Sequence, residues 1–168
     1  MTLLLLIGVT AGTYYLMSFL QAVLHREYGH RRRIAAVFEG HAVGHHGKYP
    51  AYHLQDDTYE DLEGHALNYY GIPAAVFAVA IYSAFGPLVT VAHLLGIFIT
   101  FRVNIILHRH YHLAETPLER FAWFREKRRL HFIHHQDARV NFAVVEFWID
   151  RLLGTFRAGE RAPQISGA

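Results

Sequence analysis

The chain has 168 residues, 52% of them hydrophobic, and a formal net charge of only +2 at pH 7. A charge this close to neutrality calls for no acidic polymer as a partner, so nucleic-acid binding is not expected. The chain contains no cysteine, which excludes disulfides, thiolate zinc sites and thiol catalysis and leaves nitrogen and oxygen as metal ligands.

Two segments are predicted to lie in a membrane. Residues 1–24 are uncharged and exceed the roughly 20 residues that a helix needs to cross a bilayer. They lack the basic start of a cleaved signal peptide, so an uncleaved anchor is favoured over that alternative. Residues 66–107 are twice as long as one span and are divided by Gly86 and Pro87, which predicts a helical hairpin with spans at 66–85 and 88–107.

The positions of lysine and arginine predict the orientation. None precede the first span, five lie in residues 25–71 and ten lie in residues 108–168. Because positively charged loops stay in the cytoplasm, the amino terminus is expected outside. One domain, 1–168, is expected, with a cytosolic cap built from residues 25–65 and 108–157 and a flexible tail at 158–168.

The fourteen histidines are the unusual feature of the composition, and ten of them fall in four groups within the two cap segments. These candidate metal ligands are His25, His30, His41, His45, His46, His108, His112, His131, His134 and His135. Ten imidazoles exceed the needs of one metal, so two metals are predicted, and Zn, Cu, Fe and Ni all suit such ligands. His53, His65 and His93 are expected to be ordinary polar residues.

The spacing within the groups predicts which histidines act together. Side chains three or four apart share a helix face, so three chelates are expected: His108 with His112, His41 with His45, and His131 with His134 and His135. His110, between the first two, is expected to point away. His25 and His30 are five apart, as are His41 and His46, and lie about 140° apart on an α-helix. Such pairs either serve different metals or need a distorted turn.

The ordered series H-x4-H, H-x3-HH, H-x3-H and H-x2-HH, with a membrane hairpin between the second and third, resembles a known superfamily. This is the fatty acid hydroxylase and sterol desaturase superfamily of membrane non-haem di-iron oxygenases. The stretch NFAVVEFWIDRLLGTF, residues 141–156, is similar to that superfamily's ending N-[FY]-G…WD-x-LFGT. Ala143 replaces the glycine and Ile149 interrupts the Trp-Asp pair. The resemblance covers residues 20–157.

The resemblance implies an all-α integral membrane helical bundle whose cytosolic histidine-rich cap holds two iron ions. The implied reaction is hydroxylation of an unactivated carbon–hydrogen bond of a lipid, fatty acyl or related, with O2 as cosubstrate. Electrons are expected from a separate donor, a ferredoxin or a cytochrome b5-like protein. Each ligand's second ring N–H needs an acceptor, and the nearest polar candidates are Glu27, Glu39, Asp137 and Asn141.

Other functions remain open at this point. A carotenoid hydroxylase or a sterol desaturase or oxidase would use the same scaffold. A histidine-rich metal-binding or transport protein is a more distant alternative, although a transporter would carry ionisable residues near the middle of its spans, where this chain has essentially only His93.

Two further segments have more than one interpretation. Thr116 and Pro117 predict a helix start, and the aromatic and basic residues of 121–129 suit an interfacial helix, a donor-docking surface or a solvated face. The acidic loop 55–64 either covers the site or is merely solvated.

Overall fold

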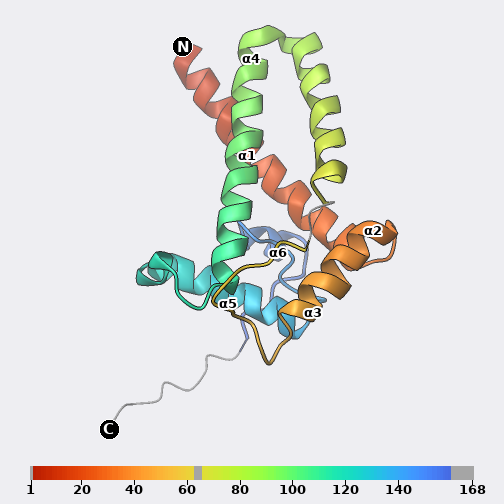
Figure 1. The fold of residues 1–168 in the computed structure, drawn as a ribbon. Helices are drawn as coiled ribbons and strands as arrows, with labels where there is room; N and C mark the ends of the chain where they lie inside the picture. The colour runs from red at the N-terminus through yellow and green to blue at the C-terminus, as the bar shows by residue number, and fades with distance from the viewer. Residues whose placement is uncertain (1, 63–65, 160–168) are drawn as a thin grey trace.

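The computed structural model describes residues 2–62 and 66–159, and its elements in this part of the chain are all helical (Figure 1). Two are long: α1 (Thr2–Leu24) and α4 (Ala66–His112). The shorter elements are two π-helical turns, η1 (His25–Gly29) and η2 (Glu39–His45), α2 (Ala35–Phe38), α3 (His46–Lys48), the 3-10 turn η3 (Pro117–Arg120), α5 (Ala122–Gln136) and α6 (Trp148–Leu152). His65 lies outside the described residues.

Helix α4 is a hairpin of two antiparallel arms. It breaks at Gly86, as predicted, where φ is 78° and ψ is −177°. A positive φ of this kind is open to glycine at little cost but strains other residues. Figure 1 shows the two arms rising from and returning to the same end of the molecule, with the reversal at the top. The break therefore returns the chain to the side on which the histidine groups lie.

Helix α1 packs closely against the returning arm of α4. A Cβ atom on Gly96 would lie 2.6 Å from the Cβ atom of Thr13, so only glycine allows this approach. The Thr10 hydroxyl donates to the Ala92 carbonyl at 3.1 Å, and the Thr13 hydroxyl lies 2.9 Å from Nδ1 of His93. Small residues and hydroxyls of this kind are typical of helix contacts in membranes. His93, expected to be an ordinary polar residue, thus bonds Thr13 through Nδ1, whereas its Nε2 is buried without a hydrogen-bond partner in the described part of the chain.

The outer surface of α1 and α4 is apolar. Large side chains such as Leu4, Val79 and Phe98 are 60% or more exposed. Two helices, Thr2–Gly29 and Ala74–His112, are long and apolar enough to cross a membrane, the second including the Gly86 break. So large an exposed apolar surface marks a membrane interaction rather than a soluble core. The fold is that of an all-α membrane protein.

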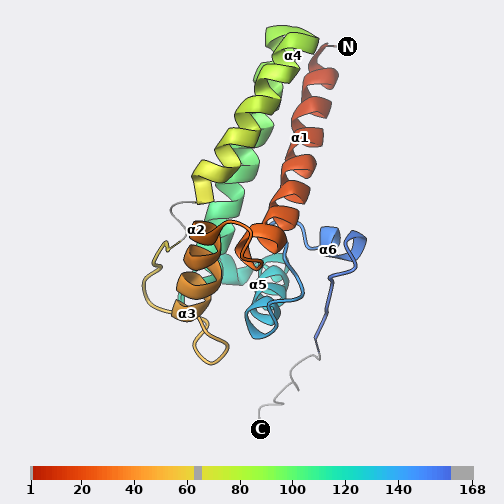
Figure 2. The same cartoon turned by 90° about the vertical axis from the view of Figure 1, so that its right-hand side faces the viewer.

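The remaining elements form a cap at the open end of the hairpin (Figure 2). One buried cluster joins Ala22 of α1 and Leu130 of α5 to Phe147 and Ile149 near the carboxy terminus. A second joins residues of α4 and α5 to the stretch 144–145. Ile149, the residue that interrupts the Trp-Asp pair, is completely buried in the first cluster. The cap is therefore anchored to the ends of both long helices.

Candidate metal centre

The ten candidate histidines converge into two clusters of five. Within each cluster, one nitrogen from each ring lies within 4.8 Å of the others. Site A consists of His25, His30, His41, His46 and His134, and site B of His45, His108, His112, His131 and His135. Because metal ions bind to converging imidazole nitrogens, each site can hold a metal.

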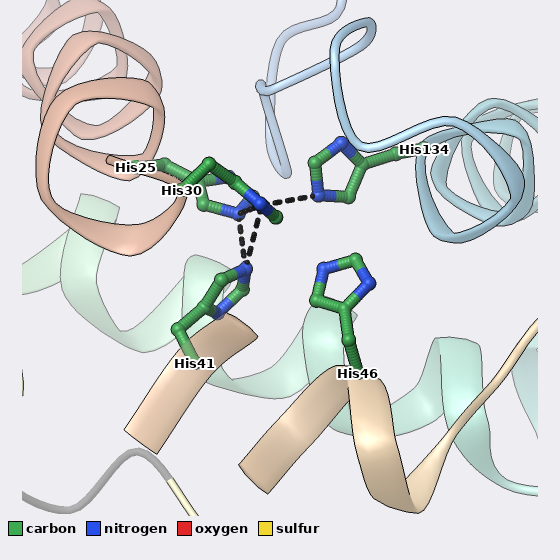
Figure 3. Close-up of side chains that lie close together, drawn as sticks. All are labelled: His25, His30, His41, His46 and His134. Carbon is green, nitrogen blue, oxygen red and sulfur yellow. Dashed lines mark hydrogen bonds between the residues drawn. The ribbon is translucent and has the colours of Figure 1, made fainter. Parts of the chain in front are cut away.

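Site A depends on the two π-helical turns. In η1 the amide of His30 donates to the carbonyl of His25 at 3.2 Å, and in η2 the amide of His46 bonds to the carbonyl of His41. A bond from residue i to residue i+5 stacks side chains that an α-helix would separate, and such turns are frequent at functional sites. Figure 3 shows the four rings meeting that of His134 from α5. The five-residue spacing of His25 and His30, and of His41 and His46, therefore reflects a distorted turn and not ligands of different metals.

The same turns correct the predicted chelates. His108 and His112 do share site B, but His41 pairs with His46 in site A while His45 belongs to site B. The α-helical spacing predicted the wrong pair because η2 is a π-turn. On α5, His134 likewise separates from its neighbours and joins site A. His110 points away, with Nδ1 2.8 Å from the Thr116 hydroxyl.

Backbone carbonyls orient four of the rings. Nδ1 of His25 lies 2.5 Å from the Phe142 oxygen and that of His134 lies 2.7 Å from the Val140 oxygen, both in site A. In site B the Leu54 oxygen accepts from His112 at 2.8 Å and the Tyr49 oxygen from His135 at 2.7 Å. A carbonyl only accepts, so each Nδ1 carries the proton and each neutral ring turns the lone pair of Nε2 into its site.

These lone pairs need a cation between them. The Nε2 atoms of His25 and His134 lie 3.2 Å and 2.9 Å from Nε2 of His30, which cannot donate to both. Nε2 of His46 and of His108 are buried without a hydrogen-bond partner in the described part of the chain. Buried polar atoms without partners are costly, so the arrangement suits a bound metal at each site.

An apolar cavity of about 530 Å³ leads to both sites. Its walls come from α1, the α2–η2 segment, both arms of α4 and the segment around Tyr59 and Leu62, and include Leu20, Phe98 and Phe101. His25 and His41 of site A and His108 of site B line its inner end. Its volume lies in the range of small-molecule sites, and its lining suits a hydrocarbon chain.

The comparison with protein families decides the classification. A family model described as "Fatty acid hydroxylase" matches residues 10–155, most of the chain. The chain belongs to the fatty acid hydroxylase family. This family is part of the fatty acid hydroxylase and sterol desaturase superfamily, an oxidoreductase group of hydroxylases and desaturases. Searches of the curated proteins and of the solved structures found no significant match.

The carboxy-terminal stretch 141–156 holds one of the two carbonyls that orient site A, that of Phe142. The buried carboxylate of Asp150 accepts the backbone N–H of Phe142 at 2.8 Å, that of Ala143 at 3.0 Å and the Thr155 hydroxyl at 2.7 Å. Burial raises the pKa of Asp150, whereas these hydrogen bonds oppose the shift. Because Asp150 binds both neighbouring amides, it fixes the peptide whose carbonyl meets His25.

The four polar residues named as candidate acceptors for the ligand N–H groups bond to other partners. Glu27 pairs with Arg26, Arg31 and Arg33, and Glu39 with Arg32. Asp137 pairs with Arg139 and Arg157. The fourth candidate, Asn141, bonds the carbonyls of Leu130 and Arg157. Because guanidinium groups lie nearby, these carboxylates pair with arginine. Neutral backbone carbonyls are left to accept hydrogen bonds from the histidine rings.

The acidic loop contributes directly to site B of this fatty acid hydroxylase family member. The amide of Asp56 donates to the His112 carbonyl and the Asp56 carbonyl accepts from Ala114, both at 2.9 Å. Tyr59 of the loop stacks toward the His112 ring with centroids 6.4 Å apart, and its hydroxyl lies 3.4 Å from Nδ1 of His108. Residues 55–62, the described part of the loop, therefore lie over site B, which agrees with the covering interpretation.

Gly29 is a site residue that the sequence pattern did not single out. A Cβ atom there would lie 3.0 Å from the ring of His25 and 3.1 Å from the ring of His41. These contacts are tighter than a side chain normally makes, so a larger residue would displace one ring. Its position between His25 and His30, inside the H-x4-H group, is the feature of the sequence that could have identified it.

The buried rings of this family member predict a pH dependence for the metal-free protein. Burial lowers the pKa of His46 to about 3 and that of His30 to about 2, and also lowers the pKa of His131 and His134. In the unfolded chain histidine has a pKa of about 6.5, so below this pH the unfolded state binds protons that the native state does not. The contribution of these rings to the free energy of unfolding is therefore fully present above about pH 6.5. Below that pH it decreases, by up to about 1.4 kcal/mol for each ring and each pH unit.

We expect the melting temperature of chelator-treated protein to be constant from pH 8 to pH 7 and to decrease steadily between pH 6 and pH 5. A melting temperature that is equal at pH 8 and pH 5 would contradict the buried, neutral state of these rings.

Proposed function

We propose that the protein is a membrane di-iron oxygenase that hydroxylates an unactivated carbon–hydrogen bond of a lipid with O2 and external electrons. One observation carries the proposal: two adjacent sites of five imidazoles each lie at the inner end of an apolar cavity, in a chain of the fatty acid hydroxylase family. A site of this composition suits iron, and the cavity suits an acyl or related chain.

The chain's own residues would bind and orient the ions. The five histidines of site A would hold one iron and the five of site B the other. The carbonyls of Phe142, Val140, Leu54 and Tyr49 would keep four of the rings in the ligating tautomer. When bound and reduced, the irons supply the activation of O2 that attack on an alkyl carbon requires. The neutral imidazoles add no negative charge to the site.

The cavity would deliver the lipid and exclude water. Leu94 and His108 both line it and lie about 20 Å apart along the returning arm of α4, by the rise of an α-helix. A chain entering from the membrane would therefore reach the histidines without crossing a polar layer. Phe98, Phe101 and Ile105 line this path and would position the chain by apolar contact.

Electrons would come from a separate ferredoxin or cytochrome b5-like donor. It would dock on the cytoplasmic side, where the excess of lysine and arginine in the cap segments favours the cap. Arg31, Arg32 and Arg33 follow His30 of site A directly, and their side chains are more than half exposed. Guanidinium groups next to a ligand favour the approach of an acidic protein surface and speed its association.

Metal analysis and isotope labelling test the proposal. Protein purified in detergent from iron-rich medium, or loaded with Fe(II) without oxygen, is expected to retain about two irons per chain, one per site. With a chemical reductant, 18O2 and a lipid panel, we expect a product that contains one 18O atom in a new hydroxyl group. Retention of zinc or copper with no iron, even after Fe(II) loading, would instead support the metal-binding or transport alternative. A carotenoid or sterol as the only substrate would support the other alternative, on the same scaffold.

A further inference from the structure

Apart from the site B ligand His108, one polar side chain in the described wall of the apolar cavity has a buried atom without a hydrogen-bond partner. Asn104 lies on the returning arm of α4 among Phe101, Ile105 and other apolar lining residues. Its side-chain oxygen is buried and has no hydrogen-bond partner in the described part of the chain. A buried acceptor without a donor is unfavourable, and most such atoms in native proteins are paired.

Neighbouring polar groups in the wall bond within the protein. The Thr100 hydroxyl, one helical turn before Asn104, donates to the Gly96 carbonyl at 2.8 Å and approaches the Tyr14 carbonyl at 3.3 Å. The side-chain oxygen of Gln21 accepts from the Val144 amide at 3.3 Å. These side chains have structural partners, which distinguishes them from Asn104.

Asn104 is also fixed relative to the metal centre. It precedes His108 of site B by four residues on one helix, so both side chains lie on the same face, about 6 Å apart along the axis. A ligand group bound to Asn104 would therefore hold the carbon atoms a few bonds away next to site B. Because one continuous helical segment carries both residues, their separation is set by the helix geometry.

We propose that Asn104 accepts a hydrogen bond from a hydroxyl group of the lipid, so that the substrate is a lipid alcohol rather than a plain hydrocarbon or ester. The inference rests on the proposed function for the identity of the cavity as the lipid site. A hydroxyl satisfies the asparagine oxygen, whereas an ether or ester leaves it buried without a donor. Asn104 thus selects the lipid and sets the position along it that reaches the metals.

The test compares two lipids that differ by replacement of the hydroxyl hydrogen with a methyl group. It uses detergent-solubilised full-length protein loaded with Fe(II), without oxygen or reductant. Equilibrium binding of tritiated 1-hexadecanol is measured, and then its displacement by unlabelled 1-hexadecanol or by its methyl ether, 1-methoxyhexadecane. We expect the affinity for the alcohol to be at least about tenfold higher than the affinity for the ether. In Asn104→Leu the alcohol should lose this advantage, while the affinity for the ether should stay the same or increase.

The matched control is Ile106→Leu, two residues further along the helix and outside the residues that line the cavity, which should keep the preference for the alcohol. Equal affinities in the wild type, or an unchanged preference in Asn104→Leu, would overturn the proposal. If Asn104→Leu does not fold, the wild-type comparison still decides. Because no turnover is involved, a failure here with iron and 18O incorporation intact would refute the role of Asn104 alone, and not the oxygenase.

Discussion

Replacement of His112 by alanine is expected to reduce the metal content by one ion per chain and the rate of lipid hydroxylation by more than about 100-fold. His112 is completely buried in site B, and its Nε2 lies 3.0 Å from that of His131. Loss of a residue that only orients a ligand typically costs 10–100-fold in metal affinity or activity, so loss of a ligand should exceed that range. Elemental analysis and product formation under 18O2 measure the two effects.

His110→Ala is the matched control, because it removes the same side chain from the same helix two residues earlier. His110 bonds Thr116 and lies outside both sites. Its replacement should leave the metal content and the product yield unchanged. If His112→Ala retained its full metal content, or if both variants lost metal equally, site B would not be the metal site that we propose.

Replacement of Asp150 by alanine is expected to be the most destabilising change in the cap. The variant would leave the buried amides of Phe142 and Ala143 without an acceptor, at roughly 1–3 kcal/mol each, or about 2–6 kcal/mol in total. For a chain of this size we expect a decrease in melting temperature of roughly 5–20 °C. Site A should also bind metal more weakly, because the Phe142 carbonyl would no longer be held against His25. Thermal unfolding in detergent and metal titration provide the two readouts.

Two comparisons separate this effect from the loss of a charge. Asp150→Asn keeps one acceptor oxygen and should lie between the wild type and Asp150→Ala. Asp57→Ala removes an exposed carboxylate and should change the unfolding free energy by no more than about 0.5 kcal/mol. An Asp150→Ala protein with wild-type melting temperature and metal affinity would show that the carboxy-terminal stretch is not needed to orient site A.

The membrane hairpin and the members of the site could be predicted from the sequence because both depend on local patterns. The hairpin follows from apolar length and from the break at Gly86. The histidines that converge were recognisable because they are grouped, uncommon in such numbers and confined to one side of the hairpin. What the spacing did not predict was their division between sites A and B.

That division depends on contacts between distant parts of the chain. A π-turn leaves no clear mark in a sequence, so the five-residue spacing of His25 and His30 left two alternatives open. The acceptors Phe142 and Tyr49 are separated in sequence from their histidines by 117 and 86 residues and act through backbone atoms that every residue possesses. No pattern of side chains could have identified them.

The basic segment before the last histidine group was also only partly predictable. Trp123 is about half exposed, as an interfacial helix would require. Arg128, however, is buried and bonds the carbonyls of Tyr111 and Leu113 and the carboxylate of Glu119. Its guanidinium is thus used to join α5 to the end of α4, and the charge is unavailable to a lipid or a donor protein.

The two histidine doublets have a consequence for the order in which the sites fill. His45 and His46 are neighbours on one stretch of chain, as are His134 and His135, yet each pair is divided between site B and site A. Adjacent Cα atoms are 3.80 Å apart, so an ion held by one residue of a doublet restricts the backbone that carries the other. The first ion therefore orders part of the backbone that carries the ligands of the other site. The two ions should bind cooperatively, with few chains that hold a single ion at intermediate metal concentration.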